Sequence, residues 1–221
     1  MMVAHRLRWG PSEYVLHGLP GDYVTEQAGS RGTFYEPDLL AYVHVKGLEG
    51  TYVDVGAHVG NHSLFFAAEC PSTRVVSIEP NDRVIDLLLK NTQDFAVPVT
   101  VWPVVVHDTW RTAGLIDIVR GNAGMARAVE GGDVQVCTLD RILASDDAVV
   151  VIKVDVEGEE PAVLRSGAET IKRCLPLIAA EVNSLACLGE IEALLLPLGY
   201  ERTGEFGPGL TITWEVPRGD V

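Results

Sequence analysis

The sequence predicts an α/β protein in which helices cover both faces of a mostly parallel β-sheet. From Thr51 onward, short β-branched runs alternate with segments of helical periodicity. The run AVVVIKVDV at 148–156 is almost entirely apolar, which is typical of a central parallel strand covered on both faces. Residues 200–216 contain two strand-like runs around a GPG turn and indicate an antiparallel hairpin at one edge.

Length and composition favour one globular domain. The chain has 221 residues, of which 47% are hydrophobic and 22% charged, so we expect a single domain over residues 1–221. Residues 1–48 are expected to form an N-terminal cap segment of that domain. The net charge of −14 repels phosphate backbones and anionic lipids, which disfavours nucleic-acid and membrane partners.

The cysteines and the chain start favour a cytoplasmic protein. The four cysteines form no CxxC pair and match no zinc-site spacing, so we expect them to be reduced. The first residues lack the apolar core of a signal peptide, and no apolar run is long enough to cross a membrane. The sequence is compatible with both a monomer and a homo-oligomer.

The first fifty residues predict one helix. A polar, glycine-rich segment at 17–32 precedes a helical pattern at Tyr35–Lys46. Pro37 suits the first turn of this helix, and Gly47 suits its end. The apolar positions of the pattern share one face: Leu39, Leu40 and Val43.

The rest of the chain alternates between strands and helices. The expected strands are apolar or β-branched runs at 51–55, 74–80, 100–108, 148–156 and 177–182. The expected helices have apolar residues at helical spacing and lie at 61–68, 81–91, 138–143, around 164–175 and around 188–198. Pro103 predicts an irregularity or an edge position in the third run, because proline has no amide hydrogen to donate. Residues 115–136 predict short strands around the glycine-rich loop GNAG at 121–124.

The turn YVDVGAHVGNHS at 52–63 marks the expected binding site. In open α/β sheets the ligand lies beyond the carboxyl ends of the strands. A dinucleotide fold would have GxGxxG here, but His58 and Asn61 occupy the second and third glycine positions. The chain has no P-loop GK[ST] either. The turn therefore disfavours a pyrophosphate ligand.

Three acidic residues near strand ends favour a cationic nucleoside instead. Asp54 precedes the turn, where a carboxylate would repel phosphate but can order an ammonium group or the amides of the turn. Glu79 ends the second strand, in position to accept hydrogen bonds from both ribose hydroxyls. Asp108 ends the third strand, where it can accept from an adenine amino group. S-adenosylmethionine suits this set, although each acid alone could also be a helix cap or a solvated loop residue.

Several segments resemble the FkbM-type S-adenosylmethionine-dependent methyltransferases. These segments are YVDVGAHVGNHSLFFA (52–67), VVSIEPN (75–81), CTLDRIL (137–143), IKVDVEGEEPAVLRSG (152–167) and LIAAEVN (177–183), with GTFYEPDLL (32–40) upstream. The resemblance implies a class I (Rossmann-like) methyltransferase fold with a seven-stranded sheet. It also implies O-methylation of a hydroxyl acceptor such as a small molecule, a sugar or a natural product. One departure is His58, where the family often carries asparagine.

The expected cofactor contacts combine the acids with the segments of the resemblance. Glu36 in the cap can receive the methionine ammonium of the cofactor, or it can simply be an acid before the proline of a first helical turn. The full set of expected contacts lies in the cap, the turn and the strand ends: Glu36, Asp54, Gly56, Ala57, His58, Gly60, Asn61, Glu79, Pro80, Asp108 and Asp155.

The block DVEGEE at 155–160 carries the candidate catalytic residues. Asp155 and Glu157 are two positions apart at the end of the central strand, so either can bind the acceptor or serve as a general base. His58, beside the turn, is a further candidate base. The alternative for the glutamates of this block is a favourable charge at the N-terminus of a helix.

A metal site is a second route to activating a hydroxyl acceptor. Asp155, Glu181 and Asn183 follow two strands that we expect to be neighbours, and their oxygen ligands suit Mg²⁺ or Ca²⁺. The alternative for Glu181 is a buried acid that pairs with Lys153. Two other functions stay open: methylation of nitrogen or of a macromolecule, and a non-catalytic accessory protein that binds S-adenosylmethionine.

Overall fold

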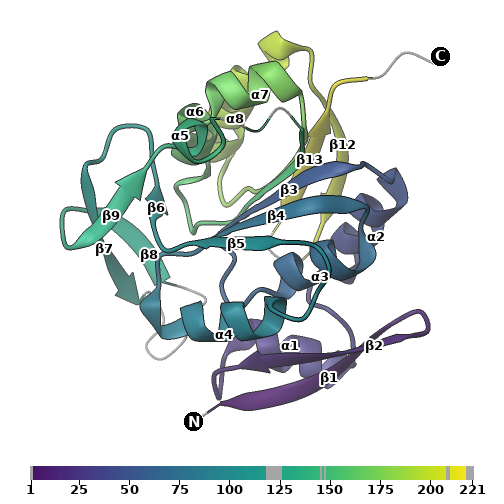
Figure 1. Cartoon of the computed structure of the whole chain (residues 1–221). Coiled ribbons are helices and arrows are strands. Elements are labelled where there is room, and N and C mark those ends of the chain that lie inside the picture. Colours follow the sequence, from purple (N-terminus) through teal and green to yellow (C-terminus); the bar gives the residue numbers. More distant parts are fainter. Residues whose placement is uncertain (1, 118–125, 145, 147, 208–209, 218–221) are drawn as a thin grey trace.

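The computed structural model describes residues 2–117, 126–144, 146, 148–207 and 210–217. At its centre lies a seven-stranded sheet with the strand order β12-β13-β11-β10-β3-β4-β5 (Figure 1). Its strands are β3 (Gly50–Val55), β4 (Ser72–Ile78), β5 (Val99–Trp102), β10 (Val149–Val154), β11 (Leu177–Glu181), β12 (Glu201–Phe206) and β13 (Thr211–Glu215).

The pairing within this sheet confirms the predicted fold class. Strand β10 pairs in parallel with β3 on one side and with β11 on the other. Strand β4 continues the parallel arrangement between β3 and β5. The hairpin of β12 and β13 joins β11 in antiparallel orientation and forms one edge. The sheet is therefore mostly parallel, with an antiparallel C-terminal edge hairpin.

Helices cover both faces of the sheet (Figure 1). One face carries α2 (Pro37–Lys46), α3 (Asn61–Glu69) and α4 (Asp82–Thr92). The other carries α5 (Leu139–Ile142), α6 (Glu160–Ser166), α7 (Ala168–Cys174) and α8 (Leu185–Leu195), followed by the 3₁₀ turn η2 (Leu196–Leu198).

The side chains of each strand contribute alternately to two apolar cores, because successive side chains of a strand point to opposite faces. In β3, Val53 and Val55 join the core under α5–α8, whereas Tyr52 joins the core under α2–α4. In β10, Ile152 and Val151 divide in the same way. Burial on both faces explains the almost continuous apolar run of the central strand.

The chain between β5 and β10 differs from the single third strand that the sequence predicts. The run at 100–108 breaks at Pro103, so β5 stays at the sheet edge and β6 (Val105–Val106) leaves it. Strand β6 pairs with β9 (Val134–Cys137) in a second sheet of order β6-β9-β7-β8. The other strands of that sheet are β7 (Thr112–Asp117) and β8 (Ala126–Glu130). The GNAG loop at 121–124 lies outside the described residues.

The helical pattern that follows β10 forms two helices rather than one. Helices α6 and α7 meet at Gly167, whose ideal Cβ would lie 2.8 Å from Leu139 Cδ2 in α5. A glycine here lets α5 approach closely, and the backbone bends at that point. The sequence pattern was therefore right about helical content and wrong about continuity.

The N-terminal segment contains more structure than predicted. An antiparallel hairpin of β1 (Val3–Trp9) and β2 (Ser12–Gly18) precedes helix α1 (Tyr23–Arg31). Leu7 and Leu16 from this hairpin are fully buried in the core that contains α3. An ideal Cβ at Gly29 in α1 would lie 2.0 Å from His5 Nδ1, so the glycine allows the helix to pack against β1. Within the described part of the chain, no helix combines the length and apolar character needed to cross a bilayer.

Candidate functional site

A cavity opens at the carboxyl ends of β3, β4 and β10. It holds about 890 Å³ of space between atoms, including the solvent at its mouth. Its walls come from the turn after β3, the end of β4, the loop after β10, strands β6–β8 and the N-terminal segment.

The turn after β3 brings main-chain atoms to the floor of the cavity. Gly56 and Gly60 have φ angles of +80° and +89°, which favour glycine. An ideal Cβ at Gly56 would lie 1.7 Å from the main-chain oxygen of Asp155, so only glycine fits between β3 and β10. The amides of Gly56 and Ala57 donate to the Ile78 carbonyl at 2.9 and 3.1 Å, which fixes the turn against β4.

Glu79 lies at the end of β4 and lines the cavity with its buried side chain. Its Oε2 accepts from the amide of His58 and its Oε1 from the amide of Asn81, both at 2.8 Å. Burial raises the pKa of Glu79, although His58 and these two amides oppose the shift. Each carboxylate oxygen keeps a further lone pair, so Glu79 can still accept from ligand hydroxyls.

Asp54 lies behind the cavity rather than in its lining. Its Oδ2 accepts from Ser63 Oγ at 2.6 Å, and Ser77 Oγ donates to Ser63 Oγ at 2.7 Å. Its Oδ1 is 3.6 Å from Lys153 Nζ. Asp54 therefore joins the end of β3 to Ser63 in α3 and to Lys153 in β10, and these contacts are to side chains rather than to the amides of the turn.

Lys153 is a buried cation surrounded by acids, and its Nζ lies 3.4 Å from Asp155 Oδ2. Burial alone would lower the pKa of Lys153, but Asp155, Asp54 and Glu36 outweigh it and raise that pKa. From the sequence, Lys153 was expected only as a partner of Glu181. The available signal was its position in β10 two residues before Asp155, because residues two apart share one strand face.

Two glutamates near Asp155 titrate near neutral pH. Burial raises the pKa of Glu157 to about 7, and the nearby Asp155 and Glu160 add to the shift. Burial likewise raises the pKa of Glu181 to about 8, with further contributions from Asp155, Glu157 and Glu160. Glu157 also has a φ angle of +59°, a strained region for a residue with a side chain. Asp155 and Glu157 both line the cavity.

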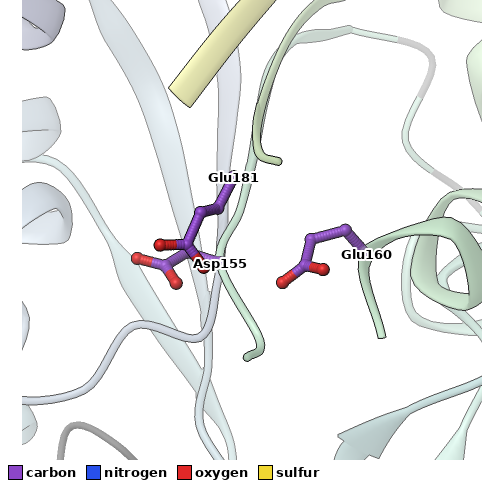
Figure 2. Close-up of side chains that lie close together, drawn as sticks. All are labelled: Asp155, Glu160 and Glu181. Atoms are coloured by element: carbon purple, nitrogen blue, oxygen red, sulfur yellow. The ribbon is translucent and has the colours of Figure 1, made fainter. Parts of the chain in front are cut away.

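Three carboxylates gather where β10, β11 and α6 meet (Figure 2). Oxygens of Asp155, Glu160 and Glu181 lie within 4.8 Å of one another. Of the predicted metal set, Asp155 and Glu181 are thus brought together, and Glu160 joins them. Asn183 is exposed beside Gly158. Glu160 Oε1 already accepts from the amides of Val156 and Gly158 at 3.0 and 3.1 Å. The Glu160 carboxylate therefore stabilises the loop between β10 and α6.

The N-terminal segment is fastened to the turn by Asn61. The side-chain Oδ1 of Asn61 accepts from the amide of Tyr35 at 2.9 Å, and its Nδ2 donates to the Tyr35 carbonyl at 3.2 Å. Tyr35 and Val24 then cover one side of the cavity.

Two histidines of the turn region add ion-pair contacts to this fastening. His58 Nε2 lies 3.0 Å from Asp22 Oδ2, and His62 Nε2 lies 3.0 Å from Glu36 Oε2. Thr211 Oγ1 donates to Glu36 Oε1 at 3.2 Å. Glu36 therefore joins the cap to the C-terminal hairpin and lies outside the cavity lining. Asp22 and the pairing role of His62 were missed, because the contacting residues are far apart in the sequence.

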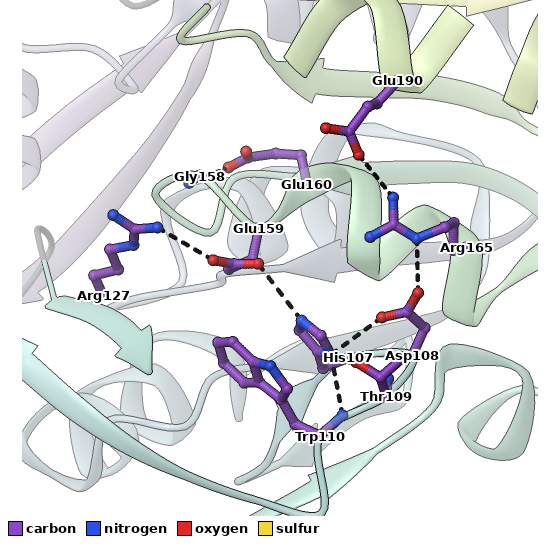
Figure 3. A network of polar contacts seen from close by, with 10 residues as sticks. All are labelled: His107, Asp108, Thr109, Trp110, Arg127, Gly158, Glu159, Glu160, Arg165 and Glu190. Carbon is purple, nitrogen blue, oxygen red and sulfur yellow. Dashed lines mark hydrogen bonds and ion pairs between the residues drawn. The ribbon is translucent and has the colours of Figure 1, made fainter. Parts of the chain in front are cut away.

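Asp108 also lies outside the cavity lining (Figure 3). Its Oδ2 accepts from Arg165 Nε at 2.6 Å. Burial opposes ionisation of Asp108, but Arg165 outweighs it and lowers the pKa of this carboxyl. The bend at Pro103 explains the difference from expectation, because it carries the chain away from the edge of the main sheet. Glu159, which contacts the neighbouring His107, lines the cavity instead.

The expected cofactor contacts thus divide into two groups among the described residues. One group lines the cavity: Gly56, Ala57, His58, Asn61, Glu79, Pro80 and Asp155. The other group lies outside the lining: Glu36, Asp54, Gly60 and Asp108.

Solved structures with the same fold include several methyltransferases. The chain is 20% identical to a methyltransferase FkbM from Methylobacillus flagellatus KT, with a TM-score of 0.56 over 76% of this chain. It spans only 43% of the length of that protein. A tRNA (uracil-54, C5)-methyltransferase from Pyrococcus abyssi, solved with S-adenosyl-L-homocysteine, is 14% identical with a TM-score of 0.50, over 96% of this chain and 42% of that one.

A third similar structure carries a different title. The precorrin 8w decarboxylase from Methanobacterium thermoautotrophicum is 17% identical, with a TM-score of 0.51 over 82% of this chain and 88% of that one. At such identities the likeness concerns the fold alone. Curated proteins include no significant match. The model of the methyltransferase FkbM domain matches residues 54–202, which is more than half of the sequence, and the chain therefore belongs to the FkbM methyltransferase family.

Proposed function

We propose that this protein transfers the methyl group of S-adenosylmethionine to a hydroxyl of a small molecule, a sugar or a natural product. The observation that carries the proposal is one cavity lined by the glycine turn, by the Glu79 carboxylate and by the Asp155–Glu157 pair. Family membership supports methyl transfer, and the methyltransferase fold implies S-adenosylmethionine as the donor.

The lining suits a cationic nucleoside. Glu79 would accept from the ribose hydroxyls, because it lines the cavity and each of its two oxygens keeps a free lone pair. The main chain at Gly56 and Ala57 would lie against the methionine part. Asp155, Glu157 and Glu159 outnumber Lys153 in the lining, so the wall attracts the sulfonium and ammonium charges of the donor.

Glu157 is our candidate for the general base. In the transfer, the acceptor oxygen attacks the methyl carbon, the carbon–sulfur bond breaks toward sulfur, and the hydroxyl proton passes to a carboxylate. A base works best when its pKa lies near the working pH, and burial raises the pKa of Glu157 to about 7. Asp155 beside Lys153 would orient the acceptor. His58 contacts Asp22 instead, which favours a role in fastening the cap.

A small acceptor fits this site better than a nucleic acid. The net charge of −14 opposes a phosphate backbone, and the cap residues Tyr35 and Val24 cover one side of the cavity. These features favour a compact acceptor that enters beside the cap.

Ligand-dependent melting tests the proposal. S-adenosylmethionine and S-adenosylhomocysteine are expected to raise the melting temperature, because a ligand that binds only the folded state stabilises it. ATP and NAD should leave it unchanged. Stabilisation by NAD alone would contradict the proposal. Transfer of a labelled methyl group into extracts, followed by mass spectrometry of the labelled product, would identify the acceptor.

The ribose assignment is tested by Glu79→Gln, with Glu190→Gln as the matched control. Glu190 is an exposed glutamate that pairs with Arg165 outside the cavity lining. Calorimetric titration should show S-adenosylhomocysteine binding at least about ten-fold more weakly to Glu79→Gln, since a hydrogen bond to a charged group is lost. The control should bind like the wild type. Equal affinity of both variants would mean that Glu79 does not hold the ribose.

A further inference from the structure

The N-terminal cap and the turn region after β3 meet through two buried histidine–carboxylate contacts. His58 Nε2 lies 3.0 Å from Asp22 Oδ2, and His62 Nε2 lies 3.0 Å from Glu36 Oε2. Asp22 and Glu36 are only 1% and 7% exposed. These four atoms are close in pairs, yet none of them forms a hydrogen bond with any described residue. Buried polar atoms normally have a hydrogen-bond partner, so a boundary with four unsatisfied ones calls for an explanation.

Asp22 connects helix α1 to this boundary. It is the N-cap residue of α1, and its Oδ1 accepts from the Thr25 amide at 3.0 Å, while Oδ2 is the oxygen beside His58. Burial opposes ionisation of Asp22, but His58 and Thr25 outweigh it and lower the pKa of the carboxyl. Val24, two residues after Asp22, lines the cavity, whereas Asp22 itself lies outside the lining. Asp22 therefore supports a wall of the cavity from behind.

His58 links the Asp22 carboxylate to Glu79. Its φ angle is +50°, in a region that histidine and asparagine enter more often than most residues with a side chain. Its main-chain amide donates to Glu79 Oε2 at 2.8 Å, and its ring contacts Asp22. One residue thus contacts both a carboxylate that lines the cavity and the cap that covers it. A shift of His58 would move both contacts together.

We propose that Asp22 is a positioning residue, which acts through His58 to couple the cap to the ligand that Glu79 binds. This inference rests on the proposed function, in which that ligand is S-adenosylmethionine. A ligand that contacts Glu79 would fix the turn, and the fixed turn would bring the His58 ring into line with the Asp22 carboxylate. The cap would in turn strengthen ligand binding, because coupling between two sites is reciprocal.

A double-mutant cycle on the affinity for S-adenosylhomocysteine tests the coupling. Asp22→Ser keeps an N-cap side chain for α1 but lacks the second oxygen that contacts His58. His58→Asn keeps a residue type that tolerates the positive φ angle. In calorimetric titration, each single variant should bind about five- to twenty-fold more weakly than the wild type. The double variant should bind no more weakly than His58→Asn, because Asp22 acts only through His58.

Asp38→Ser is the matched control. It also removes one negative charge from the cap, but at an exposed position in the first turn of α2 and outside the cavity lining, so it should bind like the wild type. Wild-type affinity in Asp22→Ser, or an equal weakening by Asp22→Ser with and without His58→Asn, overturns the inference while leaving ligand binding intact. Failure of the wild type to bind S-adenosylhomocysteine overturns the proposed function as well. Circular dichroism establishes that each variant is folded before titration.

Hydrogen exchange measures the coupling from the side of the cap. The Thr25 amide donates to Asp22, and Thr25 is fully buried outside the cavity lining. Saturating S-adenosylhomocysteine should slow the exchange of this amide at least about five-fold in the wild type and leave it unchanged in His58→Asn. An exchange rate that the ligand does not alter in the wild type, or alters equally in both proteins, overturns the inference.

Discussion

The ammonium nitrogen of Lys153 lies 3.6 Å from Oδ1 of Asp54, and the two side chains are only 4% and 0% exposed. The pair joins β10 to β3 beneath the turn, at positions that are directly opposite in the sheet register. A charge at such a depth is tolerated because its partner offsets the cost of removing it from water. The stability of the turn therefore depends on both members being present.

Lys153→Met should destabilise the protein by about 3–5 kcal/mol, because it leaves the Asp54 carboxylate buried without its cation. Chemical denaturation followed by circular dichroism measures this change. The double variant Lys153→Met, Asp54→Asn should recover part of the loss, since the uncompensated charge is then gone. A single variant that unfolds at the wild-type denaturant concentration would show that the pair contributes little.

Glu181 should make the protein less stable as the pH rises. Its pKa is about 8 in the folded state against an ordinary value of 4.5, so between these values the folded state holds a proton that the unfolded state has lost. Stability from this group is complete below about pH 4.5 and is lost as the pH rises through about 8. Glu181→Gln keeps a neutral side chain at every pH.

Thermal melts of wild type and Glu181→Gln at pH 5 and pH 8.5 check this sign. The variant should melt close to the wild type at the lower pH. At the higher pH it should melt higher by at least about 2–4 °C, the shift expected for about 1 kcal/mol in a chain of this size. A constant difference between the two proteins at both pH values would contradict the raised pKa.

Glu157→Gln should slow methyl transfer by about a hundred- to ten-thousand-fold, because a glutamine cannot take the hydroxyl proton. For the wild type, kcat/KM should rise with pH through about 7, since only the carboxylate form of Glu157 accepts a proton. Steady-state rates across this range measure both effects. Binding of S-adenosylhomocysteine should change little in the variant, and a parallel loss of binding and turnover would place Glu157 in cofactor binding instead.

Methyl transfer should survive a metal chelator. The three carboxylates of the cluster have other ways to limit their repulsion: Glu160 accepts two main-chain amides, and Glu181 holds a proton at neutral pH. Rates before and after dialysis against EDTA provide the measurement. Loss of activity that Mg²⁺ restores would show that Asp155 and Glu181 hold a catalytic metal, as the sequence pattern allowed.

The main sheet was predictable because its strands repeat one pattern. Burial on both faces makes β10 a continuous apolar run, and the same is true of β11. The N-terminal hairpin gave a weaker signal, since Leu7 and Leu16 are the only two of its residues that combine a large apolar side chain with full burial in the described structure. Helix α1 could not be predicted from its sequence, because Gly29 lowers the helix propensity of the segment. The glycine is explained only by the close packing of α1 against His5 in the folded protein.

The site residues divide according to the range of the interactions that place them. Gly56 and Glu79 follow directly from the strand that precedes each of them, so sequence order locates them. Asp108 was located in the same way, from the strand expected before it. Because β6 leaves the main sheet, however, the Asp108 side chain contacts Arg165 in α6. Glu159 is positioned by β8 and by the chain after β6, and no local pattern reveals such a long-range contact.

The attachment of the cap has a consequence for redesigning the acceptor range of this protein. Asn61 forms hydrogen bonds with the main-chain amide and carbonyl of Tyr35 and not with its aromatic ring. Any side chain except proline offers the same two main-chain atoms, so a library of substitutions at position 35 would reshape the wall of the cavity without detaching the segment that carries it. At position 35 the side chain that lines the cavity can therefore change, while the two main-chain hydrogen bonds to Asn61 stay the same.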